Sequence, residues 1–165
     1  MIRTVRAAGI LAVSATALCA SVALPALAGQ TIKFKSKHIN VATKFESGEV
    51  GDRPGHLIGF YTLKGAGTRI EGPPEPPYKI EIWGTGDYAG DGTGKDSGYG
   101  KFTFSDGSSY YEVWSGTSKA GRGTGTATYY NGTGRFEGMK GGSKWDCALL
   151  GDRGVCDVEG TIELP

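Results

Sequence analysis

Hydrophobic and polar residues alternate along several short segments of the chain. In residues 31–38 (TIKFKSKH), isoleucine and phenylalanine alternate with lysine, and in residues 101–104 (KFTF) phenylalanine alternates with lysine and threonine. Successive side chains of a β-strand point to opposite faces. This alternation therefore predicts antiparallel strands with one buried face and one face in solvent.

Turn residues divide the rest of the chain into short strands. The chain holds 29 glycines, and none of its longer stretches carries hydrophobic residues at helical spacing. Glycine, proline, asparagine and aspartate punctuate the alternating runs. We therefore predict an all-β chain of about eight strands, near residues 30–38, 55–64, 78–84, 98–105, 108–115, 123–130, 143–150 and 155–163.

Two connections and one internal similarity add detail to this arrangement. Residues 105–107 (SDG) predict a hairpin turn, and residues 71–78 (EGPPEPPY) predict a stiff, extended loop, with recognition by a proline-binding module as the alternative. Residues 80–94 (IEIWGTGDYAGDGTG) resemble residues 111–125 (YEVWSGTSKAGRGTG), which predicts two equivalent strand-and-turn units. Such a set of strands forms either a closed barrel or a two-layer sandwich, and the alternation does not separate the two.

The N-terminal segment differs from the rest of the chain. Residues 1–28 begin with two arginines, continue with an apolar run and end with Ala26-Leu27-Ala28. A basic start, an apolar middle and a small-residue end are typical of a secretory signal peptide. Leu18 precedes Cys19, where a lipoprotein would have a small residue. We therefore predict a cleaved signal peptide over 1–28, one domain over 29–165, and a periplasmic or secreted location.

The net charge limits the classes of partner. Removal of the signal peptide takes away Arg3 and Arg6 and no acidic residue, which changes the formal net charge from +1 to −1. So small a charge does not attract nucleic acid or anionic lipid. We expect no nucleic-acid partner, and no membrane partner after signal cleavage.

The two cysteines that remain after cleavage predict a disulfide. Cys147 and Cys156 flank a turn region at 151–154 (GDRG). A two-residue loop at 151–152 places the cysteines directly opposite each other in a hairpin, whereas a loop at 152–153 places them diagonally on one face. Both registers allow a bridge in an oxidising compartment. A structural bridge is favoured over a redox or metal site, because there is neither CxxC spacing nor a nearby histidine.

Motifs for conventional catalysis or cofactor binding are absent from the sequence. His38 and His56 are the two histidines, too few for a histidine-based metal site. There is no GxSxG motif, and GDGTGKD departs from a phosphate-binding loop at Ala89 and Asp96. We predict no metal and no cofactor, and the sequence leaves open whether the protein is an enzyme.

Three tryptophans and two glutamates are the candidate site residues. Alternation places Glu81 and Trp83 on one face of their strand, and Glu112 and Trp114 on one face of theirs. In one arrangement, the aliphatic residues of these strands point inward and both glutamates lie in solvent. In the other, Trp83, Trp114 and Trp145 surround a cavity, and both glutamates contact a ligand or act as catalytic groups. Burial of an unpaired carboxylate is costly, which favours the first arrangement.

Residues 132–141 (GTGRFEGMKG) combine a Gly-Thr-Gly, a basic residue, an aromatic residue and further glycines. This segment resembles one found in the eight-stranded barrels of the allene oxide cyclase and dirigent families and their bacterial relatives. The resemblance implies a single antiparallel eight-stranded β-barrel of calycin-like architecture, in a group whose members often form homo-oligomers. It also implies a tight connection across one end, with Phe136 as a plug and with Gly132, Gly134 and Gly138 supplying positive φ angles and close backbone approach.

The resemblance does not assign an activity, because a fold alone does not fix function. Three functions are compatible with such a barrel: binding of a small apolar or aromatic molecule, a cyclase or isomerase reaction in the same cavity, and a structural or interaction role with a filled interior. A filled interior would exclude the first two functions. A pocket that contains a desolvated glutamate would favour the reaction over binding alone.

Overall fold

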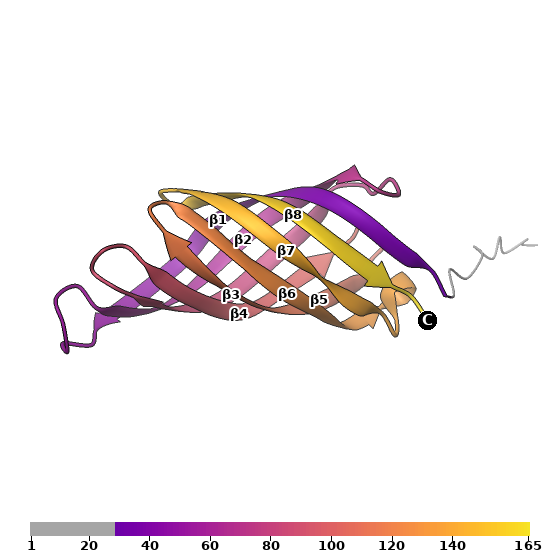
Figure 1. Cartoon of the computed structure of the whole chain (residues 1–165). Helices are drawn as coiled ribbons and strands as arrows, with labels where there is room; N and C mark the ends of the chain where they lie inside the picture. Colours follow the sequence, from indigo (N-terminus) through magenta and orange to yellow (C-terminus); the bar gives the residue numbers. More distant parts are fainter. Residues whose placement is uncertain (1–28) are drawn as a thin grey trace, which may run out of the picture.

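The computed structural model describes residues 29–165, which form one closed β-barrel (Figure 1). The predicted signal peptide lies outside the described residues. Within residues 29–165, no helix is long and apolar enough to span a membrane. A short 3₁₀ turn, η1 (Gly134–Phe136), precedes the seventh strand. The strands are β1 (Thr31–Glu49), β2 (Leu57–Glu71), β3 (Tyr78–Tyr88), β4 (Gly94–Thr103), β5 (Ser109–Lys119), β6 (Arg122–Thr133), β7 (Lys140–Leu150) and β8 (Arg153–Glu163).

The barrel closes because the first and last strands pair with each other. β1 runs antiparallel to β8, from Thr31 opposite Glu163 to Val41 opposite Arg153. Each of the other strands pairs with its neighbours in chain order. This closure excludes the two-layer sandwich and confirms the prediction of a single antiparallel eight-stranded barrel. A barrel of this size is filled by side chains or holds one small ligand.

The predicted number of strands is correct, but all eight strands are longer than predicted, β1 and β2 by the most. β1 and β2 continue as a hairpin beyond the last residue of β1 that pairs with β8. A bulge at Thr43 interrupts their pairing, because Ala42 faces Leu63 and Lys44 faces Thr62. Residues 43–49 are exposed on both faces. A strand with two exposed faces has no reason to alternate, so its sequence carries no strand signal.

Aromatic side chains fill one end of the barrel, which we call the closed end. This end carries the connections between β2 and β3, between β4 and β5, and between β6 and β7, and it lies on the right in Figure 1. Phe136 is 4% exposed, and its ring centroid lies 4.7 Å from that of Phe104 and 5.2 Å from that of Tyr110. Phe102 stacks on Tyr110 at 4.8 Å. Aromatic contacts of this kind stabilise beyond the area they bury.

A polar layer covers the aromatic end. The Arg135 guanidinium lies 4.7 Å from the Phe136 ring centroid and 4.9 Å from that of Phe104. Its nitrogens are 2.7 Å from a Glu75 oxygen and 3.1 Å from an Asp106 oxygen. Glu75 belongs to the proline-rich connection, so this connection is a loop between β2 and β3 that helps to close the barrel.

The glycines around Phe136 have two distinct structural roles. Gly134 and Gly138 have φ angles of 60° and 72°, which only glycine adopts without strain. Gly132 instead permits close approach, because a Cβ there would lie 1.8 Å from the Phe136 carbonyl oxygen. The segment 132–141 therefore folds back on itself tightly enough to insert Phe136 into the closed end.

The hairpin of β7 and β8 contains the predicted disulfide. Cys147 lies directly opposite Cys156, and their sulfur atoms are bonded. The loop is Gly151–Asp152, which is the first of the two registers that the sequence allowed.

Candidate functional site

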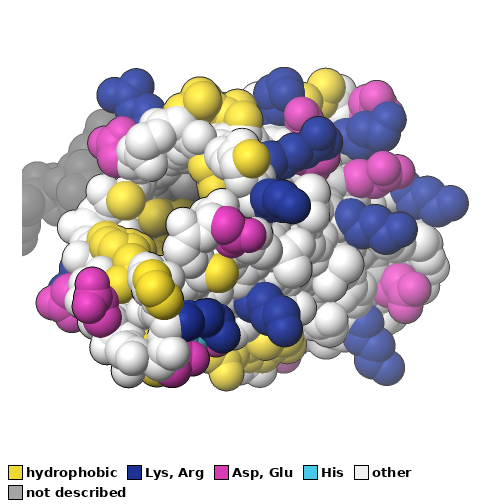
Figure 2. All heavy atoms as spheres, turned by 60° about the vertical axis from the view of Figure 1, so that its left-hand side comes forward, with side chains coloured by type: hydrophobic (Ala, Val, Ile, Leu, Met, Phe, Trp, Pro, Cys, Tyr) yellow, Lys and Arg dark blue, Asp and Glu magenta, His cyan; other side chains and the backbone are white. Residues whose placement is uncertain are grey.

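The half of the barrel opposite the closed end is hollow. A pocket of about 260 Å³ lies among residues of all eight strands and extends to the β7–β8 hairpin loop. We call the end opposite the closed end the open end. It comes forward in Figure 2, which shows a hollow with hydrophobic side chains around and inside it. The volume is just below the roughly 300–1,000 Å³ typical of small-molecule sites. The pocket therefore has room for one small ligand.

Three aromatic rings form much of the pocket wall. Tyr61 on β2 lies 6.4 Å from Trp114 on β5, and Trp114 lies 6.0 Å from Trp145 on β7, measured between ring centroids. Leu63 and Ile82 add aliphatic surface beside them. Most of the surface that this wall offers to a ligand is thus apolar, as is common in pockets that bind small molecules.

Glycines on neighbouring strands make room for these rings. Gly84 lies opposite Tyr61, and a Cβ at Gly84 would be 2.4 Å from Cζ of the Tyr61 ring. Gly125 lies opposite Trp145, and a Cβ there would be 2.3 Å from Cζ2 of Trp145. Each ring therefore lies across the neighbouring strand, against the barrel wall, and the lumen stays open.

Glu112 places a carboxyl group inside the pocket. Its side chain points inward from β5 and is 8% exposed. Gly100 lies opposite on β4, where a Cβ would be 2.8 Å from the Glu112 Oε1 atom. Burial raises the pKa of Glu112 to about 8. Near neutral pH the carboxyl is mostly protonated, so it can donate a hydrogen bond as well as accept one.

His38 is a second buried titratable group of the pocket, and it is uncharged near neutral pH. It points inward from β1, and its Nε2 atom lies 2.9 Å from the Tyr78 hydroxyl oxygen, within hydrogen-bond distance. Burial, together with the positive charge of Arg69, lowers the pKa of His38 to about 4. His38 therefore cannot neutralise a negative charge on Glu112.

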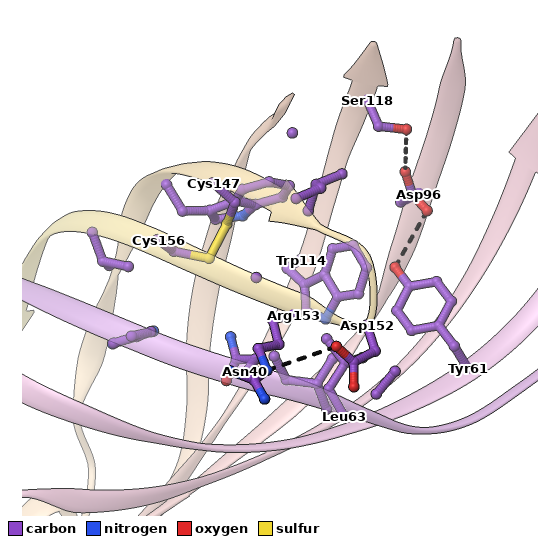
Figure 3. A pocket seen from close by; sticks show the side chains of 18 of the residues that line it. Asn40, Tyr61, Leu63, Asp96, Trp114, Ser118, Cys147, Asp152, Arg153 and Cys156 are labelled. Atoms are coloured by element: carbon purple, nitrogen blue, oxygen red, sulfur yellow. Dashed lines mark hydrogen bonds and ion pairs between the residues drawn. A yellow bond between two sulfur atoms is a disulfide. The ribbon is translucent and has the colours of Figure 1, made fainter. Parts of the chain in front are cut away.

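Asp96 organises the side of the pocket nearer the open end. Its carboxylate accepts hydrogen bonds from the Tyr61 hydroxyl at 3.3 Å, the Tyr88 hydroxyl at 2.6 Å and the Ser118 hydroxyl at 3.2 Å. Figure 3 shows Asp96 between Tyr61 and Ser118. Burial, and then the negative charge of Asp96, raises the pKa of Tyr61. The network fixes the Tyr61 ring in the wall.

The structure brings together only some of the sequence-predicted site residues. Trp114, Trp145 and Glu112 line the pocket. Trp83 and Glu81 do not line it, because the even-numbered positions of β3 point inward and Ile80 is 1% exposed. Trp83 lies on the outer wall, 37% exposed. The structure matches neither arrangement considered from the sequence in both strands. In β3 the aliphatic Ile80 points inward and Glu81 outward, whereas in β5 Glu112 points inward and Val113 is exposed.

Sequence analysis did not identify Tyr61, Tyr88 or Asp96 as site residues. In β2, hydrophobic side chains lie on both faces, since Phe60 is exposed on the outer wall while Tyr61 faces the pocket. Asp96 lies in the glycine-rich stretch GKDSGYG, which has no hydrophobic alternation. Its position became evident only from the pairing of β4 with β3 and β5.

The fold and the site define a closed eight-stranded barrel with a pocket of small-molecule size. Within residues 29–165, no cluster of histidine, cysteine, aspartate and glutamate side chains could hold a metal ion. No protein-family model matches the chain, and no curated protein matches it. The resemblance of residues 132–141 to the allene oxide cyclase and dirigent families therefore stays a prediction.

Proposed function

We propose that the protein binds a small, largely apolar or aromatic molecule in the open half of its barrel. The observation that carries this proposal is the division of the interior, which is packed with aromatic rings at the closed end and hollow over about 260 Å³ in the other half. Protein interiors without a ligand site are close-packed. Tyr61, Trp114 and Trp145 offer apolar surface to such a ligand.

Tryptophan fluorescence tests this proposal directly. The chain has three tryptophans, of which Trp114 and Trp145 line the pocket and Trp83 lies outside. The variant Trp83→Phe removes the outer fluorophore, so the remaining signal comes from the pocket. Titration with fatty acids, phenolic compounds and aromatic amines should give a saturable change for at least one compound, and a flat response to the whole panel would contradict the proposal.

A second candidate function is a cyclase or isomerase reaction in the same pocket. The specific observation that favours it is the desolvated Glu112, whose pKa of about 8 suits proton transfer near neutral pH. In this function Glu112 donates a proton to the bound molecule or removes one from it. The apolar wall holds the substrate in a reactive conformation and excludes water.

Chromatography of the bound compounds separates reaction from binding alone. Each compound that binds is incubated with the protein and analysed for a product of unchanged mass. The variant Glu112→Gln should retain binding and lose conversion, because an amide cannot transfer the proton. Equal conversion by the variant, or no conversion of any bound compound, would contradict the catalytic function and leave the binding function intact.

We further propose that the protein is exported to the periplasm or the medium and that its barrel is related to the allene oxide cyclase and dirigent families. The Cys147–Cys156 bridge supports export, because disulfides persist in oxidising compartments. Burial of Phe136 at the closed end supports the relationship. Mass spectrometry of the exported protein should show a chain that begins at Gly29, and an uncleaved N-terminus would contradict signal processing.

A further inference from the structure

The pocket carries more negative than positive charge. Its lining includes Asp96, Glu112 and Asp152, and the basic side chains among these lining residues are Arg153 and His38. Arg153 lies 3.7 Å from Asp152, and both side chains are exposed at the open end, so these two charges offset each other. His38 is neutral near pH 7, because its pKa is about 4. Asp96, and Glu112 when it ionises, therefore have no counter-charge among the lining residues.

The two remaining carboxyl groups differ in their hydrogen bonding. Asp96 accepts hydrogen bonds from three hydroxyl groups, those of Tyr61, Tyr88 and Ser118. Glu112 has no comparable set of hydroxyl donors among residues 29–165, and burial raises its pKa. A buried polar group without a partner is costly unless a ligand satisfies it.

Aromatic rings line the same pocket as Glu112. Trp114 is two residues further along β5 on the same face, and Trp145 and Tyr61 flank Trp114. The faces of aromatic rings attract positively charged nitrogen, and aromatic cages are a common means of binding organic ammonium groups. An anionic ligand would instead meet the Asp96 carboxylate, which has no counter-charge among the lining residues.

We propose that the ligand is an organic cation, an amine or quaternary ammonium compound with a small apolar or aromatic body. Its positively charged nitrogen lies at Glu112, and its body lies against Trp114, Trp145 and Tyr61. This inference rests on the proposed binding function and names the ligand class. It gives Glu112 the role of counter-ion rather than proton donor.

Cation binding couples to ionisation of Glu112. In the empty pocket near neutral pH the carboxyl is mostly protonated. A bound cation favours the carboxylate, so Glu112 releases its proton to solvent when the ligand binds. A permanently charged quaternary ammonium ligand has no proton of its own to lose, and any proton released must come from the protein.

Other titratable groups around Glu112 keep their protonation in this range. Tyr129 lies opposite Glu112 on β6, Tyr78 projects inward from β3, and Tyr110 precedes Glu112 on β5; burial raises the pKa of all three. On β1, His38 is already neutral. The released proton can therefore be assigned to Glu112.

Isothermal titration calorimetry tests the ligand class and the proton together. Three ligands share one skeleton and differ in charge: phenethylamine, 2-phenylethanol and phenylacetate. The amine should bind at least about tenfold more tightly than the alcohol, and the carboxylate should bind most weakly. Benzyltrimethylammonium, titrated near pH 7 in buffers of different ionisation enthalpy, should release most of one proton, because the Glu112 carboxyl is mostly protonated at this pH before the ligand binds.

Two variants provide the controls. Glu112→Gln should lose the preference for the amine over the alcohol and release no proton. Glu81→Gln, which changes a glutamate on the outer wall of β3, should behave as the wild type. Circular dichroism of both variants checks that the barrel is folded.

The outcomes separate this inference from the proposed function. If the alcohol or the carboxylate binds as tightly as the amine, the ligand class is wrong and the binding function stands. If the three ligands fail to bind but a neutral compound of the fluorescence panel binds, the ligand class is also wrong. If no compound binds in either experiment, both the function and the inference are wrong.

Discussion

At the scale of single residues, Glu112 is the residue on which both the catalytic proposal and the proposed ligand class depend, and its ionisation destabilises the folded protein. Its pKa rises from 4.5 to about 8 on folding, so the folded state holds the proton more tightly than the unfolded state. Stability therefore falls as the pH rises from about 4.5 to 8. The free energy of unfolding of Glu112→Gln, relative to wild type, should increase over this range by on the order of a few kcal/mol.

Denaturant unfolding at a series of pH values measures this difference. The gain of the variant should be smallest at the acidic end, where the wild-type carboxyl is protonated in both states. It should reach its maximum above the folded pKa. Parallel stability curves of the two proteins between pH 4.5 and 8 would show that Glu112 is not desolvated as the structure indicates.

His56 makes the opposite pH-dependent contribution at the open end. Its Nδ1 and Nε2 atoms bind Asp52 and, at 2.9 Å, Asp87, so that the β1–β2 loop is attached to β3. The hydrogen bond with Asp52, above all, raises the pKa of His56 above 6.5. Protonated His56 therefore stabilises the folded protein fully below pH 6.5, and this stabilisation is lost as the pH rises through the pKa of His56 in the folded state.

The variant His56→Gln should therefore be less stable than wild type in acid and should approach wild-type stability in mild alkali. Thermal unfolding of both proteins near pH 5.5 and near pH 8.5 checks this. A stability difference that is the same at both pH values would mean that the protonated imidazole is not held by the two carboxylates.

At the scale of elements, the pairing of an aromatic ring with a glycine on the next strand keeps the pocket open. Gly84 is the clearest test, because the nearest atoms to a Cβ there belong to the movable Tyr61 ring rather than to backbone. Gly84→Ala should push this ring away from the wall and into the pocket. Ligand affinity should fall by about tenfold or more, with a loss of about 1–3 kcal/mol in stability.

The fluorescence titration of the proposed function measures the affinity of this variant. Gly48→Ala is the matched control, since a Cβ at Gly48 meets no atom within 4 Å. It should bind ligand as the wild type does. Unchanged affinity of Gly84→Ala would contradict the role of the glycine in shaping the pocket.

The predictable part of the fold depends on local signals, and the unpredictable part depends on which face of each strand is buried. Strand number, the 105–107 turn and the cysteine pair follow from alternation and turn residues. The similar segments 80–94 and 111–125 mislead, because Trp83 points outward and Trp114 inward. The two tryptophans are an odd offset of 31 positions apart in the sequence, while even-numbered residues point inward in both strands.

The closed end determines these faces. The ring centroid of Tyr78, the first residue of β3, lies 4.9 Å from that of Phe104. The ring centroid of Tyr110 on β5 lies 4.8 Å from that of Phe102. With Tyr78 and Tyr110 both fixed inside, every second residue after them is also inside. The hydrophobic pattern of one strand does not predict such packing between strands. The sequence therefore indicated Glu112 as a candidate site residue but did not place it in the pocket.

The disulfide is a second element whose contribution can be measured. Cys147 and Cys156 close a loop with a sequence separation of 9 residues in the β7–β8 hairpin. The double variant Cys147→Ser/Cys156→Ser should lose about 2–3 kcal/mol of stability. Guanidinium unfolding of the oxidised wild type, the reduced wild type and the variant checks this. The reduced wild type should match the variant, and equal stability of all three would contradict a stabilising bridge.

At the scale of the whole molecule, the residues that stabilise the fold and the residues that form the pocket lie at opposite ends of the barrel. The packed closed end supplies apolar burial and holds both described chain ends, where the Gly29 amide donates to the Pro165 carbonyl at 2.7 Å and the Leu164 amide donates to the Gln30 carbonyl at 2.9 Å. The open half carries the pocket. The two chain ends can therefore be joined at the closed end without a change in the pocket, provided that Phe136 stays in place.

Circular permutation tests this separation. Joining Pro165 to Gly29 with a short linker and opening the chain between Asp91 and Gly92, in the exposed β3–β4 loop, should give a folded barrel that binds the same ligands. Opening the chain between Glu137 and Gly138 instead releases the segment that inserts Phe136. That permutant should lose several kcal/mol, as expected for removal of a buried aromatic side chain, which costs about 3–5 kcal/mol. If the first permutant failed to fold while the second matched wild-type stability, the closed end would not be the part of the barrel that holds it together.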